Sequence, residues 1–167
     1  LVLLSKPSRE KTRSLVAYVL MWPAVGTLGS YLMSSAGPIF LDVLYGGHSG
    51  LVAALQGEGA KGTLKAYGYL WSAYTNRFDA LGGGISAMPS MHLAAAMIYI
   101  LASRRSLWLL LSVPFWTVIF LCSAYFGYHY WIDDLVGSAI ACLCWIPTTR
   151  FYNRPAPEPV IVASQSL

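Results

Sequence analysis

The chain has 167 residues, the length of a single domain. It is 56% hydrophobic and only 11% charged, whereas soluble domains carry about a quarter charged residues. This deficit excludes an ordinary soluble core, so we expect an integral membrane protein. The net charge is only +4, and we expect no nucleic-acid partner.

Four apolar segments are predicted to cross a bilayer, because a spanning helix needs about 20 mainly apolar residues. In chain order they are residues 14–33, 90–103, 106–128 and 131–149. The first contains Pro23, which predicts a kink or a packing seam. The second covers only about 20 Å and crosses if Arg104 and Arg105 snorkel at one end. The sequence therefore predicts an all-α, polytopic transmembrane bundle with at least four spans.

The segment between the first two spans, residues 34–88, is rich in glycine and aromatic residues and is expected on the non-cytoplasmic side. Within it, residues 63–78 combine apolar positions at mixed helical spacing with Tyr and Trp, which is typical of an interfacial helix or lid. We expect one membrane-embedded domain over residues 1–154, beginning with the end of an earlier helix. Residues 155–167 are predicted to form a disordered cytoplasmic tail.

The distribution of Lys and Arg predicts the orientation, because cytoplasmic loops carry an excess of both. Four crossings place eight basic residues on one face: Lys6, Arg9, Lys11, Arg13, Arg104, Arg105, Arg150 and Arg154. This face is expected to be cytoplasmic, in a cytoplasmic (inner) membrane. The same crossings bring residues 89–92 and 129–133 together on the non-cytoplasmic side, where a shared site is predicted.

The Pro89-Ser90 pair is typical of a helix start, since serine caps helices well. The next amides lack helical acceptors, and with the helix dipole they form a site for anions. Ser90 is therefore a candidate phosphate ligand, with a purely structural N-cap as the alternative.

His129 and Asp133 are four residues apart, so on a helix they would share one face. The carboxylate could accept a proton from one imidazole nitrogen and leave the other lone pair exposed, as in an oriented nucleophile or base. The alternative is a snorkelling histidine beside an aspartate at the membrane edge. Ionisable residues at membrane depth are energetically costly, however, and their presence there favours a functional role. His92 is the second acid–base candidate. Asp134 is assigned an interfacial role.

A phosphate site also needs cations to offset the charge on the non-bridging oxygens. Arg77 is the first candidate, because a guanidinium binds phosphate bidentately. Lys61 and Lys65 are further candidates. For each of these three cations, the alternative to phosphate binding is a surface charge that interacts with lipid headgroups. His48 has no partner at useful spacing and is interpreted as a loop residue.

The Pro-Ser-Met-His run at residues 89–92 and the His-Tyr-Trp-Ile-Asp run at 129–133 resemble two signatures of the type 2 phosphatidic acid phosphatase superfamily. Residues 34–38 resemble a segment of its inositolphosphotransferase and sphingolipid-synthase branch. The resemblance covers residues 34–149 and implies a helical membrane enzyme that needs no metal or cofactor. It also implies roles for four residues: nucleophile for His129, orienting carboxylate for Asp133, proton donor for His92 and phosphate binding for Ser90.

The chain departs from the superfamily's phosphatases at one informative point. They carry a Ser-Arg pair seven and six residues before the second histidine, where this chain has Cys122 and Ser123. The sphingolipid-synthase-like branch does without that arginine and transfers the phosphate group to a lipid alcohol, whereas a phosphatase uses water. We therefore expect a lipid phosphotransferase or lipid phosphatase acting on a phospholipid or another lipid phosphate, with a slight preference for transfer.

A second departure concerns the family's first signature, Lys-x6-Arg-Pro. Lys6 and Arg13 have its spacing, but Ser14 replaces the proline and the predicted crossings put both cations on the opposite face. They are therefore not assigned to the site.

Two alternatives stay open at this point. The two histidines and a carboxylate could form a facial triad for iron or zinc, although the resemblance implies no metal. The chain could also be a non-catalytic membrane subunit or a pseudoenzyme that packs in a larger membrane complex. The three cysteines lie in apolar runs without metal-ligand spacing and are interpreted as helix-packing thiols.

Overall fold

The computed structural model describes residues 8–47, 49–76 and 85–152. The described residues are helical, with no strand among them and one isolated antiparallel bridge between Ala36 and Ser86. The elements, in chain order, are α1 (Arg9–Met21), the π-helical η1 (Trp22–Gly29), α2 (Ser30–Leu32), the 3₁₀ turn η2 (Pro38–Phe40), α3 (Leu41–Tyr45), α4 (Leu51–Gly57), α5 (Lys61–Asn76), α6 (Met91–Ser103), α7 (Leu109–Tyr125) and α8 (Trp131–Tyr152). The all-α prediction is confirmed. The predicted tail at residues 155–167 lies outside the described residues.

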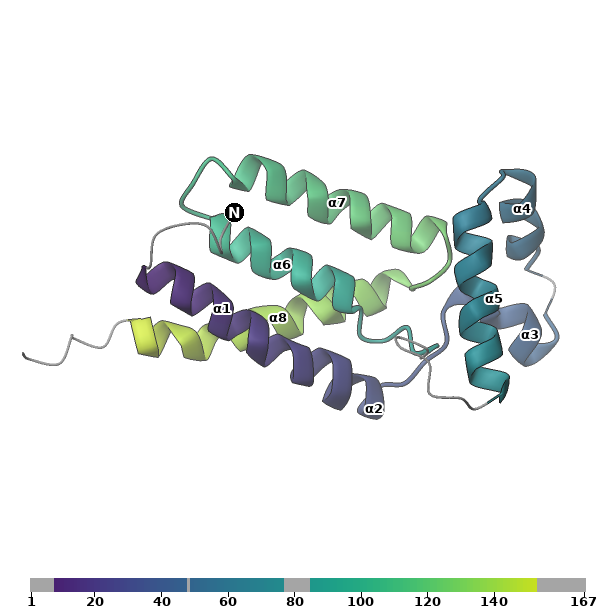
Figure 1. Cartoon of the computed structure of the whole chain (residues 1–167), viewed down its shortest axis with the longest axis horizontal. Helices are drawn as coiled ribbons and strands as arrows, with labels where there is room; N and C mark the ends of the chain where they lie inside the picture. Colours follow the sequence, from purple (N-terminus) through teal and green to yellow (C-terminus); the bar gives the residue numbers. More distant parts are fainter. Residues whose placement is uncertain (1–7, 48, 77–84, 153–167) are drawn as a thin grey trace, which may run out of the picture.

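Four long helical segments form a bundle: the first segment, which consists of α1, η1 and α2, and the helices α6, α7 and α8. Within this bundle, α6 lies between α1, α7 and α8 (Figure 1). Its core contains Met21, Val25, Ile98 and Trp145, which come from the first helical segment, α6 and α8. Within the described residues, two helices are long and apolar enough to cross a membrane, Arg9–Leu32 and Trp131–Thr149. α6 and α7 are shorter apolar helices, so the expected count of at least four spans stays a prediction.

Large apolar side chains cover the outside of this bundle. Leu110 on α7 is 71% exposed and Leu143 on α8 is 63% exposed, and they belong to a larger set on α1, α7 and α8. Contiguous apolar surface of this kind is rare on soluble monomers. Together with the two candidate spans, it fits a protein whose helices contact lipid.

The sequence around Pro23 forms the packing seam that the sequence analysis allowed. The backbone widens into the π-helical η1 here, since proline supplies no N–H for the regular helical ladder. Gly26 and Gly29 face α6 and the turn before it: a Cβ on Gly26 would lie 2.6 Å from the Met91 Cε, and one on Gly29 would lie 2.7 Å from the Pro89 Cγ. The glycines therefore let the first helical segment approach the start of α6 closely.

Charged residues at one end of the bundle tie three helix ends together. Arg13 is 7% exposed, and its guanidinium carbon lies 4.4 Å from the centroid of the Trp145 ring of α8. Arg104, at the end of α6, lies 5.1 Å from the same centroid and 3.8 Å from Glu10 of α1. The starts of α6 and α8 consequently share the opposite end of the bundle.

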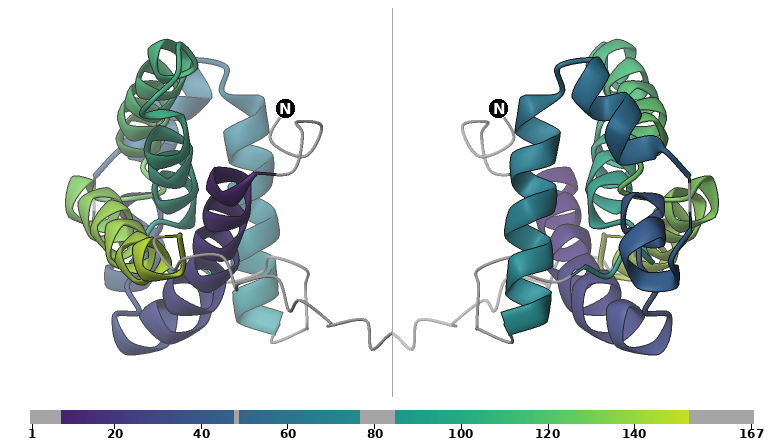
Figure 2. Two further views of the ribbon diagram at one scale, coloured as in Figure 1. Left: turned by 90° about the vertical axis from the view of Figure 1, so that its left-hand side faces the viewer. Right: turned by 90° about the vertical axis from the view of Figure 1, so that its right-hand side faces the viewer.

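The helices α3, α4 and α5 form a cap beyond that opposite end (Figures 1 and 2). Its core is built on Ile39, Phe40 and Leu55. The cap is joined to the α7–α8 loop by Ile39 N–H donating to the Gly127 carbonyl at 2.8 Å and by the Tyr128 hydroxyl donating to the carbonyl of Thr63 at 2.8 Å. The predicted helix at residues 63–78 is observed as α5, while its interfacial position stays a prediction.

Gly137 of α8 provides a test of the contact between α6 and α8. A Cβ at this position would overlap the carbonyl group of Ser90. We expect Gly137→Ala to lower the free energy of unfolding by about 1–3 kcal/mol, because overpacking forces the helices apart. The measurement is the unfolding midpoint of the purified protein in detergent.

The control is Gly68→Ala in α5, where an added Cβ meets nothing within 4 Å. Alanine is the better helix former there, so this variant should be at least as stable as the wild type. Equal stability of both variants would contradict the close contact at Gly137.

Candidate active site

Ser90 begins α6 and links it to α8. Its Oγ accepts a hydrogen bond from Leu93 N–H at 3.5 Å, which confirms the predicted N-cap. Its own N–H donates to the Asp133 carbonyl at 3.0 Å, and the residue is fully buried. The start of α6 is thus fixed against the start of α8, with first-turn amides in the arrangement that binds anions.

The structure brings His92 and His129 together although they are far apart in the sequence. The centroids of the two rings lie 6.3 Å apart, and the ring planes are inclined by 64°. His92 is the second residue of α6, whereas His129 lies in the loop before α8. A group the size of a phosphate could contact both rings at this separation.

The orientation of His129 is set by a backbone carbonyl. Its Nδ1 lies 2.6 Å from the carbonyl oxygen of Ala87. A carbonyl oxygen only accepts hydrogen bonds, so Nδ1 carries a proton, and in the neutral imidazole the free lone pair is then on Nε2. The Ala87 segment is itself held by the bond from Ala87 N–H to the Ser35 carbonyl at 2.5 Å. In the neutral ring, this arrangement would let Nε2 act as an oriented nucleophile or base.

The prediction that His129 and Asp133 share a helical face is wrong, because α8 begins only at Trp131. Gly127, at φ +72°, turns the chain after α7 and leaves His129 in the loop. The Asp133 Oδ2 instead accepts from Tyr130 N–H at 2.8 Å, which is a cap at the helix start. Asp133 therefore fixes the backbone that follows His129.

Asp134, for which an interfacial role was predicted, is fully buried. Its Oδ2 forms a short hydrogen bond with the Ser123 hydroxyl of α7. It also interacts electrostatically with both His92 and His129. The available signal was a second carboxylate in an apolar helix, where an ionisable group is expensive.

Of the three predicted phosphate-binding cations, the structure describes Lys61 and Lys65. Lys61 and Lys65 are exposed on α5 and, among the residues that the structure covers, form no hydrogen bond or ion pair with the site. Arg77 lies outside the described residues, as does His48.

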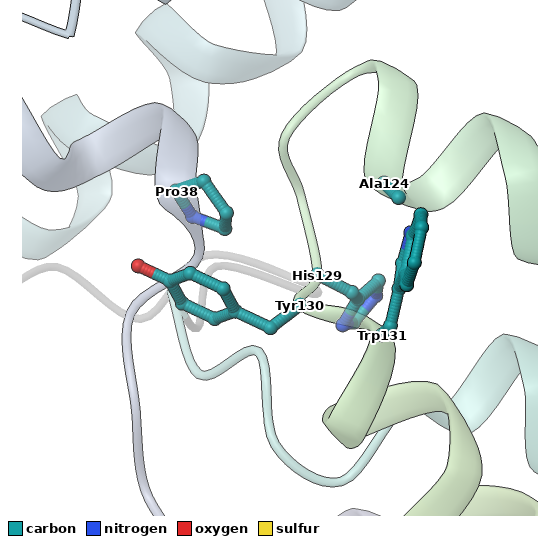
Figure 3. A pocket seen from close by; sticks show the side chains of 5 residues that line it. All are labelled: Pro38, Ala124, His129, Tyr130 and Trp131. Atoms are coloured by element: carbon teal, nitrogen blue, oxygen red, sulfur yellow. The ribbon is translucent and has the colours of Figure 1, made fainter.

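A pocket of about 350 Å³ lies next to His129 (Figure 3). Pro38, Ala124, Tyr130 and Trp131 complete its lining. The Tyr130 ring extends toward Pro38 and the Trp131 ring lies beside Ala124, with the imidazole between them. Trp131 is 62% exposed, so an apolar wall connects the candidate nucleophile with the outer surface of the bundle.

The competing metal hypothesis needs three or more ligands in one place. In the part of the chain that the structure describes, no group of three His, Cys, Asp or Glu side chains has such an arrangement. The geometry is that of two imidazoles facing a shared space beside a capped helix start.

A family model described as the PAP2 superfamily matches residues 1–146 of the chain. The match covers most of the sequence, and the chain belongs to this superfamily. Membership of this superfamily indicates a phosphatase-type enzyme. No curated protein and no solved structure matches the chain.

The helix cap formed by Asp133 can be tested with two variants that distinguish the role of its oxygen as an acceptor from the role of its negative charge. Asp133→Ala removes the acceptor for Tyr130 N–H and should lower the free energy of unfolding by about 1 kcal/mol. Asp133→Asn keeps an oxygen acceptor and should lower it by only about a few tenths of a kcal/mol. Thermal unfolding in detergent measures both, and an equal loss in the two variants would contradict the capping role.

Proposed function

We propose that the chain is a membrane-embedded lipid phosphotransferase or lipid phosphatase in which His129 is the nucleophile. The observation that carries this proposal is the pair of neighbouring imidazoles, with His129 Nδ1 held by the Ala87 carbonyl. Membership of the PAP2 superfamily supports the reaction class and a lipid-phosphate substrate.

In the proposed reaction, His129 Nε2 attacks phosphorus and forms a phosphohistidine while the bond from phosphorus to the leaving alkoxide breaks. Protonated His92 gives its proton to that alkoxide. In the second step, water or a lipid alcohol attacks phosphorus, returns its proton to His92 and releases His129. The first-turn amides of α6 offset the charge on the non-bridging oxygens. Asp133 acts indirectly, through the backbone beside His129.

The cations of this reaction belong to the proposal as well. Arg77 is proposed as a phosphate ligand, because a guanidinium binds phosphate bidentately. Lys61 and Lys65 of α5 would attract anionic headgroups to the cap. The Ser90 hydroxyl, which caps α6 here, would also bind phosphate by donating its hydrogen.

Transfer to a lipid alcohol is the slightly favoured outcome. Cys122 and Ser123 stand where the superfamily's phosphatases carry Ser-Arg, and the sphingolipid-synthase-like branch lacks that arginine too. The pocket beside His129 is walled by aromatic and apolar side chains, which suits the apolar part of a lipid better than bulk water. We place the site at the non-cytoplasmic face of an inner membrane, opposite the basic helix ends.

The test is a product analysis with the full-length chain in detergent. Radiolabelled phosphatidic acid is incubated with and without ceramide as the acceptor. Labelled ceramide phosphate is expected as a product, and free phosphate alone would identify hydrolysis. His129→Ala should lower both products at least about a thousandfold, since the nucleophile is lost.

The matched control is Cys122→Ser, an exposed position on α7, which should retain wild-type rates. A His129→Ala protein with an unchanged product pattern would contradict the proposal and favour a non-catalytic subunit of a larger membrane complex.

Trp131 tests whether the lipid part of the substrate occupies the pocket. We expect Trp131→Ala to raise KM for a long-chain lipid phosphate about tenfold, because the large apolar contact is lost. KM for 4-nitrophenyl phosphate, which has no acyl chain, should change less than about twofold. Trp108→Ala, at the other end of α7, is the control and should leave both constants unchanged. Equal effects on the two substrates would contradict lipid binding at this pocket.

A further inference from the structure

The loop between α7 and α8, which carries His129, is bonded to α7 on one side and to the cap on the other. On the α7 side, the N–H groups of Tyr128 and His129 donate to the Ser123 carbonyl, at 3.1 Å and 3.4 Å. On the cap side, the Gly127 carbonyl accepts from Ile39 N–H at 2.8 Å. Three consecutive residues that end at the proposed nucleophile are thus held between two parts of the fold.

The Tyr128 side chain adds a longer-range bond to this loop. Its hydroxyl donates to the carbonyl of Thr63, in the first turn of α5, at 2.8 Å and across 65 positions of the sequence. The residue is partly buried and packs against the apolar core of the cap. With the hydroxyl held by α5, the backbone of Tyr128 is fixed to the cap, and the next residue along the chain is His129.

Two close approaches join the cap to the same residues. A Cβ on Gly37, just before η2, would overlap the Tyr128 carbonyl, and a Cβ on Gly127 would overlap the Leu51 side chain of α4. Added atoms at either glycine would push the loop and the cap apart. The cap therefore contacts the loop through η2, α4 and α5 together.

The backbone of this loop determines where the His129 ring lies. The Ala87 carbonyl fixes the orientation of the ring through Nδ1, whereas the distance from Nε2 to a bound phosphorus atom also depends on the place of the backbone. A nucleophile must lie about 3–3.5 Å from the atom that it attacks, and a displacement of about 1 Å can lower the rate about a hundredfold. Whatever holds the loop consequently bears on the rate of attack.

We propose that Tyr128 is a positioning residue through which the cap sets the place of the nucleophile. Its hydrogen bond to the Thr63 carbonyl of α5 holds the His129 loop so that Nε2 stays at attacking distance from phosphorus. The inference rests on the proposed function. It gives the cap a part in the first chemical step, in addition to any contact with lipid headgroups.

The test uses Tyr128→Phe in the full-length chain, which keeps the ring and removes only the hydroxyl. We expect kcat for 4-nitrophenyl phosphate to fall at least about tenfold, because the loosened loop holds Nε2 less often at attacking distance. KM should change less than about twofold, since the bond acts on the transition state and not on substrate binding.

Two inhibitors separate positioning from a loss of folded protein. Orthovanadate bonds to the nucleophile and mimics the transition state, whereas inorganic phosphate binds without that bond. In Tyr128→Phe, the inhibition constant of vanadate should rise by about the factor by which kcat falls, and that of phosphate should change less than about twofold. A smaller folded fraction would lower kcat and leave both inhibition constants unchanged.

A second variant loosens the cap by a different chemical change. Leu51→Ala removes the side chain that covers Gly127 and should lower kcat at least about threefold, with a parallel rise in the vanadate constant. The matched control is Tyr74→Phe, at an exposed tyrosine of α5. This control should keep wild-type values of kcat, KM and both inhibition constants.

An unchanged kcat in Tyr128→Phe, or a lower kcat with an unchanged vanadate constant, overturns the positioning role. Leu51→Ala decides by the same two outcomes if Tyr128→Phe does not fold. The proposed function stands in these cases as long as the wild type turns over the ester and His129→Ala does not. A wild type without turnover contradicts the proposed function, and the positioning role falls with it.

Discussion

The starts of α6 and α8 are held together by a hydrogen bond from Ser90 N–H to the Asp133 carbonyl, and the candidate site depends on this contact. Gly137 permits it, because any side chain there would overlap Ser90. The same contact places His92, near the start of α6, opposite the loop that carries His129. Two histidines from segments far apart in the chain lie close together because the starts of two helices are in direct backbone contact.

Near His129, a backbone group and a side chain have different roles. A neutral carbonyl orients His129, while the carboxylate of Asp133 satisfies a helix end. A carbonyl group fixes the tautomer of His129 without adding a negative charge. A carboxylate in the same place would repel an anionic substrate, and this repulsion is strong where the dielectric constant is low.

The arrangement of the bundle explains how such a polar site suits a lipid substrate. The basic ends of α1, α6 and α8 lie together at one end, and the histidines lie at the other, under the cap of α3, α4 and α5. Apolar side chains cover the outside between these ends. The pocket beside His129 joins the site to this apolar surface, so the headgroup and the tail of the proposed lipid substrate would meet environments of matching polarity (Figure 3).

Local sequence determined the helical class, the start of α6 at Ser90 and the position of α5, because apolar periodicity and capping act over a few residues. The Pro-Ser-x-His and His-x3-Asp runs also pointed to the superfamily that the family model shows. Tertiary structure decided which groups touch His129. The Ala87 carbonyl has no side-chain signature, and the turn at Gly127 placed α8 after His129, so helical spacing misjudged Asp133. It also turned Asp134 inward, since burial depends on which helices pack against α8 and not on the residue alone.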